Sequence, residues 1–191
     1  MTDPASPAPA RRRRLRGVLR WMEHLLATLG ALLLIYHVGF DLTVMVSPSM
    51  SPTLQGTRPE DGDWVLMERV SYWFRKPRRW EVVAFLNTDG TPVMKRVVGL
   101  PGERIHLRDG QVEINGEVVP FPASIANLRY FPYGTLANRR PADCGGGYFV
   151  LGDDTQDSQD SRYEGTVALP KIRGRSWLIV WPLSRIRFVT P

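Results

Sequence analysis

Directly after the long apolar segment of the chain stands the octapeptide Ser47-Pro48-Ser49-Met50-Ser51-Pro52-Thr53-Leu54. Because proline fixes its own φ and disfavours helix in the residue before it, this stretch is a stiff, non-helical loop. A stiff loop can hold a serine hydroxyl in one place, as a nucleophile requires. A plain turn that leaves a membrane anchor fits the same residues, and the octapeptide alone does not separate the two interpretations.

The composition fits one folded domain with an anchor. The chain has 191 residues, of which 43% are hydrophobic, and its 17 glycines and 16 prolines favour turns and short strands over a helix bundle. Residues 1–20 contain six arginines and one acidic residue, Asp3, so they carry +5 of the net charge of +6. The rest of the chain is close to neutral, and we expect no basic surface on the folded body that would bind nucleic acid. The single cysteine, Cys144, excludes an intrachain disulfide and has no histidine beside it, which indicates an incidental role.

The N-terminal part of the chain predicts a membrane anchor. The apolar run 25–40 is about 24 Å long as a helix, and flanking residues extend it toward the roughly 30 Å of hydrocarbon. The arginines before it predict a cytoplasmic N-terminus by the positive-inside rule, with the rest of the chain on the outer side. Two alternatives are a cleaved signal peptide, for which residues 38–42 lack an A-x-A pattern, and a buried core helix. We expect a disordered basic tail at 1–20 and an anchor helix at 21–46.

The remaining chain predicts a mainly β body. Asp109-Gly110 and Asn115-Gly116 separate alternating residues over 104–119, which is typical of a β-meander. Residues 120–147 are irregular and rich in proline and glycine, which favours a surface loop or a small cap. Apolar runs bounded by turn residues predict strands at 64–70, 82–86, within 93–103, at 148–151, around 165–169 and at 176–181.

A serine nucleophile needs a base, and the body offers two candidates. Its one histidine, His106, stands in the meander without a nearby carboxylate pattern, so a Ser-His-Asp triad is hard to build. Lys95 lies between the apolar pairs 93–94 and 97–98. Burial there would lower its pKa and make the neutral amine available as a base. A lysine that points to solvent from the strand edge is the alternative.

An acidic loop near the end of the chain raises the question of a metal site. Asp153, Thr155, Asp157 and Glu164 occupy positions 1, 3, 5 and 12 of a calcium-binding loop. Ser158 stands at position 6, where the EF-hand requires glycine, and the flanking residues do not predict helices. We therefore expect no metal and no cofactor.

Three segments together resemble sequence boxes of the type I signal peptidases. Residues 47–54 look like the S-x-S-M-x-P-T-L box of that family, and residues 95–103 look like its K-R-x-x-G-x-P-G-[DE] box. Residues 152–162 look like G-D-N-x-x-x-S-x-D-S-R, and residues 63–68 are similar to a fourth, weaker box. The order of the segments and the N-terminal anchor match as well, and the resemblance covers about residues 20–182.

The resemblance implies a Ser/Lys peptidase that removes signal peptides after small residues, with an Ala-x-Ala preference. Ser49 would be the nucleophile and Lys95 its general base. The Ser49 amide and the Ser47 hydroxyl would form the oxyanion hole, and Ser158 would orient the lysine amine. The supporting ionic framework would consist of Arg96, Asp153, Asp160 and Arg162. The substrate pockets would be lined by Met45, Val46, Met50 and Met94.

The resemblance also implies a largely β catalytic core, here 47–101 and 148–191, with a small β insertion at 102–147. Its implied partners are secretory preproteins and the lipid bilayer of the cytoplasmic membrane, and we expect a single-pass monomer. A lysine at the position of the base resembles the bacterial and organellar branch of the family. One departure is Asp154, which stands where the family usually has asparagine.

Two other functions remain open from the sequence. A related Ser/Lys peptidase could process one dedicated substrate, such as a conjugation pilin, or cleave itself as SOS-type repressors do, although no helix-turn-helix pattern precedes the body. A catalytically silent, anchored β domain could act as a binding module. Reaction of Ser49 with a serine-directed inhibitor would distinguish an active site from a silent one.

Overall fold

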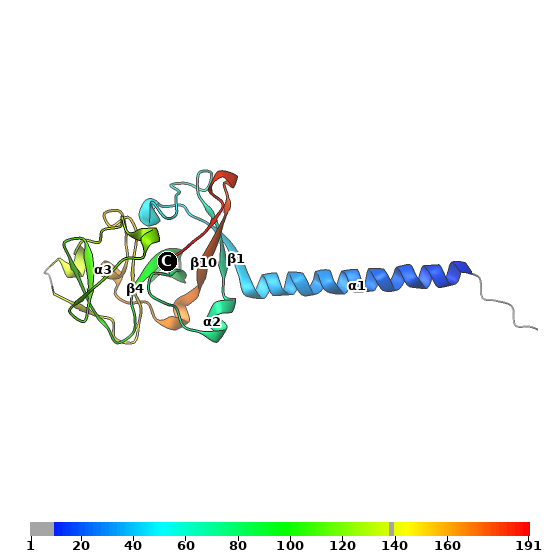
Figure 1. The fold of residues 1–191 in the computed structure, drawn as a ribbon, viewed down its shortest axis with the longest axis horizontal. Helices are drawn as coiled ribbons and strands as arrows, with labels where there is room; N and C mark the ends of the chain where they lie inside the picture. Colours follow the sequence, from blue (N-terminus) through cyan, green and yellow to red (C-terminus); the bar gives the residue numbers. More distant parts are fainter. Residues whose placement is uncertain (1–9, 138–139) are drawn as a thin grey trace, which may run out of the picture. The chain divides into compact units, whose positions relative to one another are not determined.

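The structure, a computed structural model, describes residues 10–137 and 140–191 and divides the chain into two units, residues 1–39 and 40–191 (Figure 1). The elements in chain order are α1 (Ala10–Gly39), β1 (Phe40–Val44), η1 (Pro48–Met50), β2 (Trp64–Glu68), α2 (Val70–Phe74), β3 (Val82–Leu86), β4 (Pro92–Gly99), β5 (Arg104–Arg108), β6 (Gln111–Ile114), β7 (Glu117–Val119), η2 (Ala123–Ile125), η3 (Gly134–Leu136), β8 (Ala142–Asp143), β9 (Phe149–Leu151), α3 (Ser161–Glu164), η4 (Leu169–Lys171), β10 (Ile172–Trp181), η5 (Leu183–Arg185) and β11 (Arg187–Phe188).

Helix α1 differs from the predicted anchor at both ends. It begins at Ala10, directly after Pro9 in the sequence, and arginine and leucine are good helix formers, so residues 10–20 are helical rather than part of a tail. It ends at Gly39 because residues 40–44 pair with β2, so the expected helix over 21–46 is too long. Residues 1–9 lie outside the described residues. The part from Arg16 to Gly39 has 24 residues and includes an 18-residue window with a mean hydropathy of 1.5; it is about 36 Å long, enough to cross a membrane.

The second unit is built on a large antiparallel sheet, sheet A, in the order β1-β2-β10-β3-β4-β9, with β11 paired to β10. This confirms the prediction of a mainly β body. The strand expected around residues 165–169 is wrong, because only Val167 forms an isolated bridge, to Tyr148. Pro170 has no N–H for a strand ladder and lies in the short helix η4 instead.

Alternation along β3 shows that sheet A is covered on both faces. Val82 and Ala84 pack into one apolar cluster, and Val83 and Phe85 pack into another. The first cluster also holds Met50 and Leu54, both fully buried, so the octapeptide loop is fixed to the sheet by its own apolar side chains. A serine between such anchors has little freedom to move.

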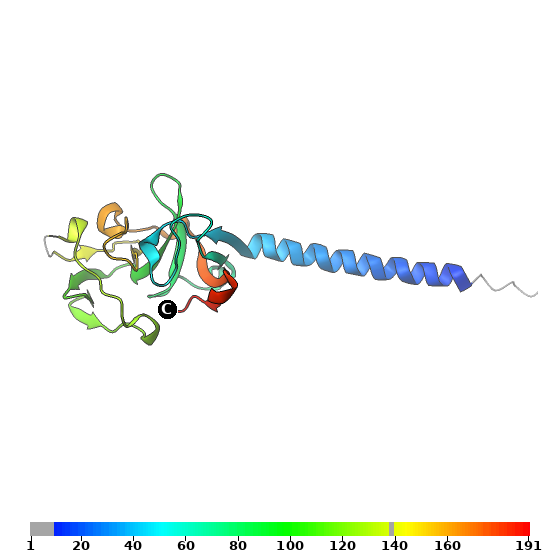
Figure 2. The same ribbon diagram turned by 90° about the horizontal axis from the view of Figure 1, so that it is seen from above.

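A second, smaller antiparallel sheet, sheet B, has the order β7-β6-β5-β8 and confirms the predicted meander. Both turns have positive φ at their two central residues, Asp109-Gly110 and Asn115-Gly116, as two-residue hairpin turns require. Its apolar side chains pack in one cluster with residues next to sheet A, among them Trp80 and Phe149. Figures 1 and 2 both show sheet B at the end of the second unit opposite to β1 and β10.

Candidate active site

Ser49 lies in the short helix η1, five residues after the end of β1. Its neighbours hold the turn closed: Ser51 N–H donates to Pro48 O at 2.7 Å, and Leu54 N–H donates to Met50 O at 2.8 Å. Only 5% of Ser49 is exposed. The proline-rich loop therefore holds Ser49 in one place, as expected of a stiff loop, and the structure adds that this place is nearly solvent-free.

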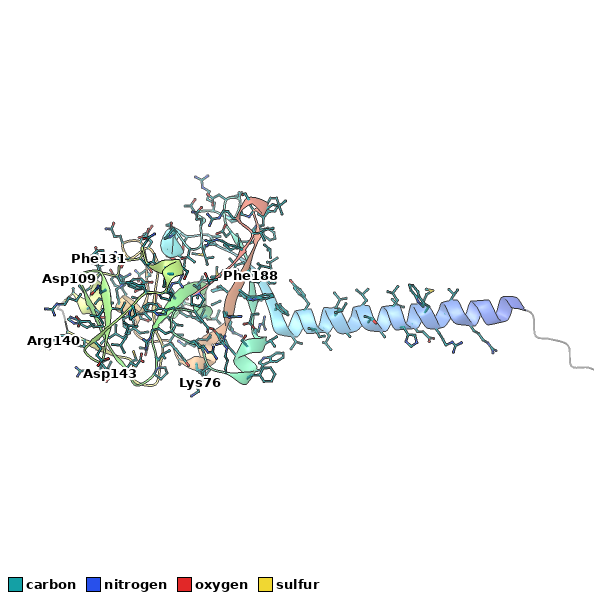
Figure 3. The ribbon with its side chains drawn as sticks, in the orientation of Figure 1. Lys76, Asp109, Phe131, Arg140, Asp143 and Phe188 are labelled. Atoms are coloured by element: carbon teal, nitrogen blue, oxygen red, sulfur yellow. The ribbon has the colours of Figure 1, made fainter. Side chains whose placement is uncertain are left out.

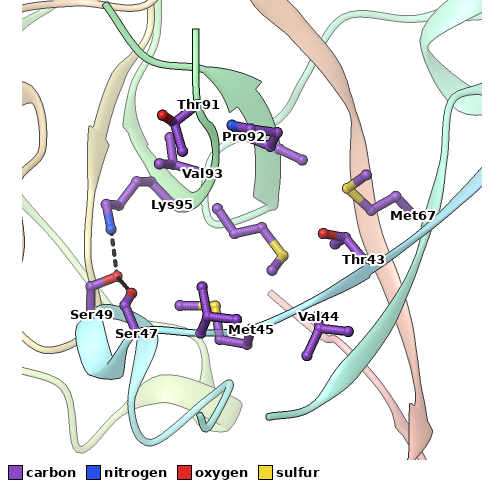
Figure 4. Close-up of a pocket in the computed structure, with 13 residues that line it drawn as sticks. Thr43, Val44, Met45, Ser47, Ser49, Met67, Thr91, Pro92, Val93 and Lys95 are labelled. Atoms are coloured by element: carbon purple, nitrogen blue, oxygen red, sulfur yellow. Dashed lines mark hydrogen bonds between the residues drawn. The ribbon is translucent and has the colours of Figure 1, made fainter. Parts of the chain in front are cut away.

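Lys95 reaches this serine from β4. Its Nζ lies 2.6 Å from Ser49 Oγ, and only 4% of the residue is exposed (Figure 4). Burial lowers the pKa of Lys95, and the carboxylates of Asp160, Asp153 and Glu164 oppose that shift only in part. A lowered pKa keeps a larger fraction of the amine neutral near neutral pH. The neutral amine can accept the serine proton across this short contact.

The Ser47 hydroxyl completes a small cluster of hydroxyl groups. Ser47 Oγ lies 3.0 Å from Ser49 Oγ, as the dashed line in Figure 4 shows. Ser49 also contributes a backbone N–H from the first turn of η1, where N–H groups have no partner within the helix. A hydroxyl and an N–H beside one nucleophile are the donors that an oxyanion needs.

Two arginine–aspartate pairs with fully buried side chains lie beside this cluster. Arg96 binds Asp153 through two hydrogen bonds, of 2.8 and 2.7 Å, and Arg162 binds Asp160 in the same two-pronged way, at 2.8 and 2.7 Å. Buried charges need partners and hydrogen bonds to stay charged, and each of these pairs supplies them. The four framework residues predicted from the sequence are therefore brought together.

The Arg96–Asp153 pair is tied directly to the serine loop. Thr53 Oγ1 donates to Asp153 Oδ2 at 2.5 Å, and the N–H of Asp154 donates to Ser49 O at 3.1 Å. Gly152 allows this close approach, since a Cβ there would lie 2.5 Å from Ser49 O. The loop after β9 thus fixes the backbone of Ser49 as well as the charges around Lys95.

Ser158 lies next to the site but is bonded differently from the expectation. Its hydroxyl donates to Asp160 Oδ2 at 2.7 Å, and within 10–137 and 140–191 it forms no hydrogen bond with Lys95. The Asp160 carboxylate is the stronger acceptor for a hydroxyl, because it is charged. Ser158 therefore contacts the ion pair, and in this structure the Lys95 amine is oriented by Ser49.

An apolar pocket of about 220 Å³ opens beside Ser49 and Lys95. Met45, Val46 and Met94, which we expected in the substrate pockets, line it, whereas Met50 is fully buried and does not. Pro92 and Val93 of β4 also line it, and so do residues that the sequence did not indicate: Thr43, Val44, Met67, Ala84 and Thr91. Strand alternation in β2 and β3 is the signal that could have pointed to Met67 and Ala84.

The competing sequence interpretations fit the structure less well. His106 Nδ1 lies 2.9 Å from Glu113 Oε2 on the neighbouring strand of sheet B. The hydrogen-bond partner of His106 is therefore a carboxylate of that sheet and not Ser49. Asp153, position 1 of the calcium-loop pattern, accepts bonds from arginine, threonine and tyrosine side chains instead of facing an open site. Cys144 is buried, and burial raises its pKa to about 11, which makes it a poor nucleophile.

Comparison with known proteins gives consistent similarities. The profile of the family described as signal peptidase, peptidase S26, matches residues 18–181. A probable signal peptidase I-2 from Synechocystis is 35% identical over 151 residues, which are 75% of this chain and 64% of that protein, just under two thirds of its length. A signal peptidase I from Leptolyngbya laminosa is 33% identical, covering 76% and 70%. The crystal structure of a signal peptidase I from Enterococcus faecalis superposes with a TM-score of 0.42 at 33% identity, over 53% of this chain and 97% of that one.

Proposed function

The chain belongs to the signal peptidase family, peptidase S26, and on that basis we propose that it is a membrane-anchored serine endopeptidase that removes N-terminal signal peptides from exported preproteins. The observation that carries the proposal is the contact of 2.6 Å between Lys95 Nζ and Ser49 Oγ, both nearly inaccessible to solvent. A serine beside a buried amine with a lowered pKa is an activated nucleophile.

In the proposed reaction, neutral Lys95 accepts the Ser49 hydroxyl proton while Oγ attacks the carbonyl carbon of the scissile bond. The oxyanion that forms is held by the Ser49 N–H and the Ser47 hydroxyl. Protonated Lys95 then gives the proton to the departing amine, and the signal peptide remains esterified to Ser49. A water molecule, deprotonated by the again neutral Lys95, attacks the ester; Lys95 then returns the proton to Ser49 Oγ as the ester bond breaks, and the signal peptide leaves with a free carboxylate.

The ionic framework has a positioning role in this proposal. Arg96 and Arg162 neutralise Asp153 and Asp160, the two carboxylates that raise the pKa of Lys95 most. Ser158 supports the Asp160 end of the framework through its 2.7 Å bond. Without their arginine partners, these carboxylates would favour the protonated, inactive amine.

The pocket supports a preference for small side chains. Residues 92–95 of β4 pair with β3 on one side, while the pairing of β4 with β9 begins only at Arg96, so this segment has an open edge. We propose that a substrate adds there as an extended strand between β4 and residues 45–47. The methionines that line the pocket leave room for alanine-sized residues, which would give the Ala-x-Ala preference.

We propose that α1 spans the cytoplasmic membrane once, with its arginine-rich end on the cytoplasmic side and residues 40–191 on the outer side, as a monomer. Aromatic side chains on the second unit support contact of that unit with lipid. Trp73 and Phe74 of α2 are exposed by 57% and 83%, and Trp181 is half exposed. Aromatic residues of this kind favour the membrane interface.

The test is cleavage of several different precursors with Ala-x-Ala sites, in detergent, by the full chain. We expect the wild type to cut after the last alanine, and Ser49→Ala and Lys95→Ala to be folded but inactive. Lys76→Ala, which removes an exposed lysine outside the pocket, is the matched control and should retain activity. Cleavage of a single precursor type would favour a dedicated processing peptidase instead, and cleavage of none, with no labelling of Ser49, would favour a silent binding module.

A further inference from the structure

A buried tyrosine from the inserted part of the chain contacts the ionic framework. Tyr130 is fully buried, and its hydroxyl donates to Asp153 Oδ1 at 3.0 Å. Burial raises the pKa of Tyr130 well above its usual value, so the phenol remains a donor at every working pH. Asp153 therefore accepts four hydrogen bonds, two from Arg96, one from Thr53 and one from Tyr130.

The residue after Tyr130 contacts the second ion pair. Phe131 O accepts a bond of 3.2 Å from Arg162, and Phe131 N–H donates to Thr155 Oγ1 at 3.2 Å. Thr155 also accepts from Arg162 through its carbonyl and hydroxyl oxygens, at 2.8 and 2.9 Å. Two consecutive residues of the insertion thus support both arginine–aspartate pairs, one through a side chain and one through the backbone.

Sheet B fixes the position of this dipeptide. Tyr130 N–H donates to Gly110 O at 3.1 Å, which joins it to the β5–β6 turn. The ring of Tyr130 packs against Phe121, with 5.8 Å between the ring centroids, inside the apolar cluster that packs against sheet B. Figure 3 shows Phe131 and Asp109, the first residue of that turn, near each other at the inserted end of the unit.

From Asp153 the contacts continue to the nucleophile. Asp153 lies between Gly152, which packs against Ser49 O, and Asp154, whose N–H donates to that same oxygen at 3.1 Å. Thr53, in the serine loop itself, donates to the other oxygen of the Asp153 carboxylate. A shift of Asp153 therefore moves Ser49 relative to Lys95, and a misplacement of about 1 Å in an active site can reduce the rate about a hundredfold.

We propose that Tyr130 is a positioning residue, through which the inserted sheet holds Asp153, and with it Ser49, in the geometry for catalysis. The inference rests on the proposed peptidase function. The insertion then supports the active site, and its apolar core is shared with residues of sheet A. Tyr130 does not line the pocket beside Ser49, and it acts through the Arg96–Asp153 pair.

The test is Tyr130→Phe in the full chain, which removes the hydroxyl and keeps the ring. We expect kcat for precursor cleavage to fall by about tenfold with KM within about twofold of wild type, at a temperature where both proteins are folded. Tyr148→Phe is the matched control, because Tyr148 is equally buried and no bond of its hydroxyl to the site occurs in the described residues. It should leave kcat unchanged.

A second measurement reports on Ser49 without signal peptide cleavage. The rate at which a serine-directed β-lactam-type inhibitor labels Ser49 should fall in Tyr130→Phe by the same factor as kcat, and should not fall in Tyr148→Phe. A Tyr130→Phe protein with wild-type kcat and labelling rate would overturn this inference and leave the proposed function intact. An equal loss in both tyrosine variants would also overturn it, since general loosening of the core would then be the cause.

Discussion

Sheets A and B differ in what their residues bury. Sheet A and the loop after β9 enclose charged side chains, including Lys95, Arg96 and Arg162, each at most 4% exposed. In the described part of residues 102–147, which forms sheet B, no charged side chain is buried to that degree, and the pair His106–Glu113 remains 22% and 16% exposed. Sheet B is packed through apolar side chains. Sheet A encloses charged side chains, which can stay buried only because each has a charged or hydrogen-bonding partner.

The contrast between apolar packing and buried charge distinguishes residues that stabilise the fold from residues that take part in the proposed reaction. In an apolar core, the free energy of unfolding falls when side-chain volume is removed. At a buried charge, it falls when the oppositely charged partner is removed. Tyr130 belongs to both groups, because it packs in the apolar cluster of sheet B and its hydroxyl bonds Asp153 in the loop after β9. The following predictions test this separation.

Lys95→Met should have the largest effect on activity. The change removes the proposed base and keeps an unbranched apolar side chain in the same space, so cleavage should fall by at least about 10³-fold. Because a buried amine is replaced by an apolar group, the free energy of unfolding should not decrease at neutral pH. Cleavage rates and denaturant unfolding of the same preparation measure both. A destabilised Lys95→Met would show that sheet A needs this amine for folding.

Arg162→Met should have the largest effect on stability. It leaves the Asp160 carboxylate buried without its cation, which should lower the free energy of unfolding by about 3–5 kcal/mol. Arg69→Met is the matched control, because the Arg69–Asp41 pair is 36% and 52% exposed and should contribute about 1 kcal/mol or less. Equal losses in chemical denaturation would contradict the distinction between the two regions.

The pH dependence of cleavage should follow the Lys95 amine. Burial lowers its pKa, so the neutral form exists at a lower pH than for an exposed lysine, and activity should rise with pH and fall about tenfold per unit below that pKa. Glu164 is exposed and raises the pKa of Lys95, so Glu164→Gln should move the acid limb to lower pH. The measurement is kcat/KM against pH for both proteins. A profile that is flat from about pH 6 to 10 would rule out a lysine base.

Ile105→Val should have the smallest effect. Ile105 is fully buried in sheet B, and the loss of one methyl group there should lower the free energy of unfolding by about 0.5–1.5 kcal/mol. Cleavage at a temperature well below unfolding should be unchanged, because the Tyr130–Asp153 bond is retained. A loss of activity larger than the loss of folded protein would show that the packing of sheet B also affects the site.

The sequence allowed the local features to be predicted better than the long-range ones. The turns Asp109-Gly110 and Asn115-Gly116 follow from backbone conformation, and the burial of Lys95 is one of the two interpretations that its apolar neighbours in the strand allowed. The bonds of Tyr130 and Ser158 could not be predicted, because each joins segments whose proximity depends on the assembled sheets. The helix boundary at Gly39 was missed for the same reason, since strand pairing at residues 40–44 decides it.

The proposed base of this site exists only in the folded chain. Before β4 is buried, Lys95 is an ordinary ammonium group, and Ser49, 46 residues away in sequence, is an ordinary alcohol. Folding of sheet A brings the two groups together and lowers the lysine pKa in the same event. A peptidase of the proposed kind is silent while its chain is being synthesised, because acquisition of the native structure is its activation step.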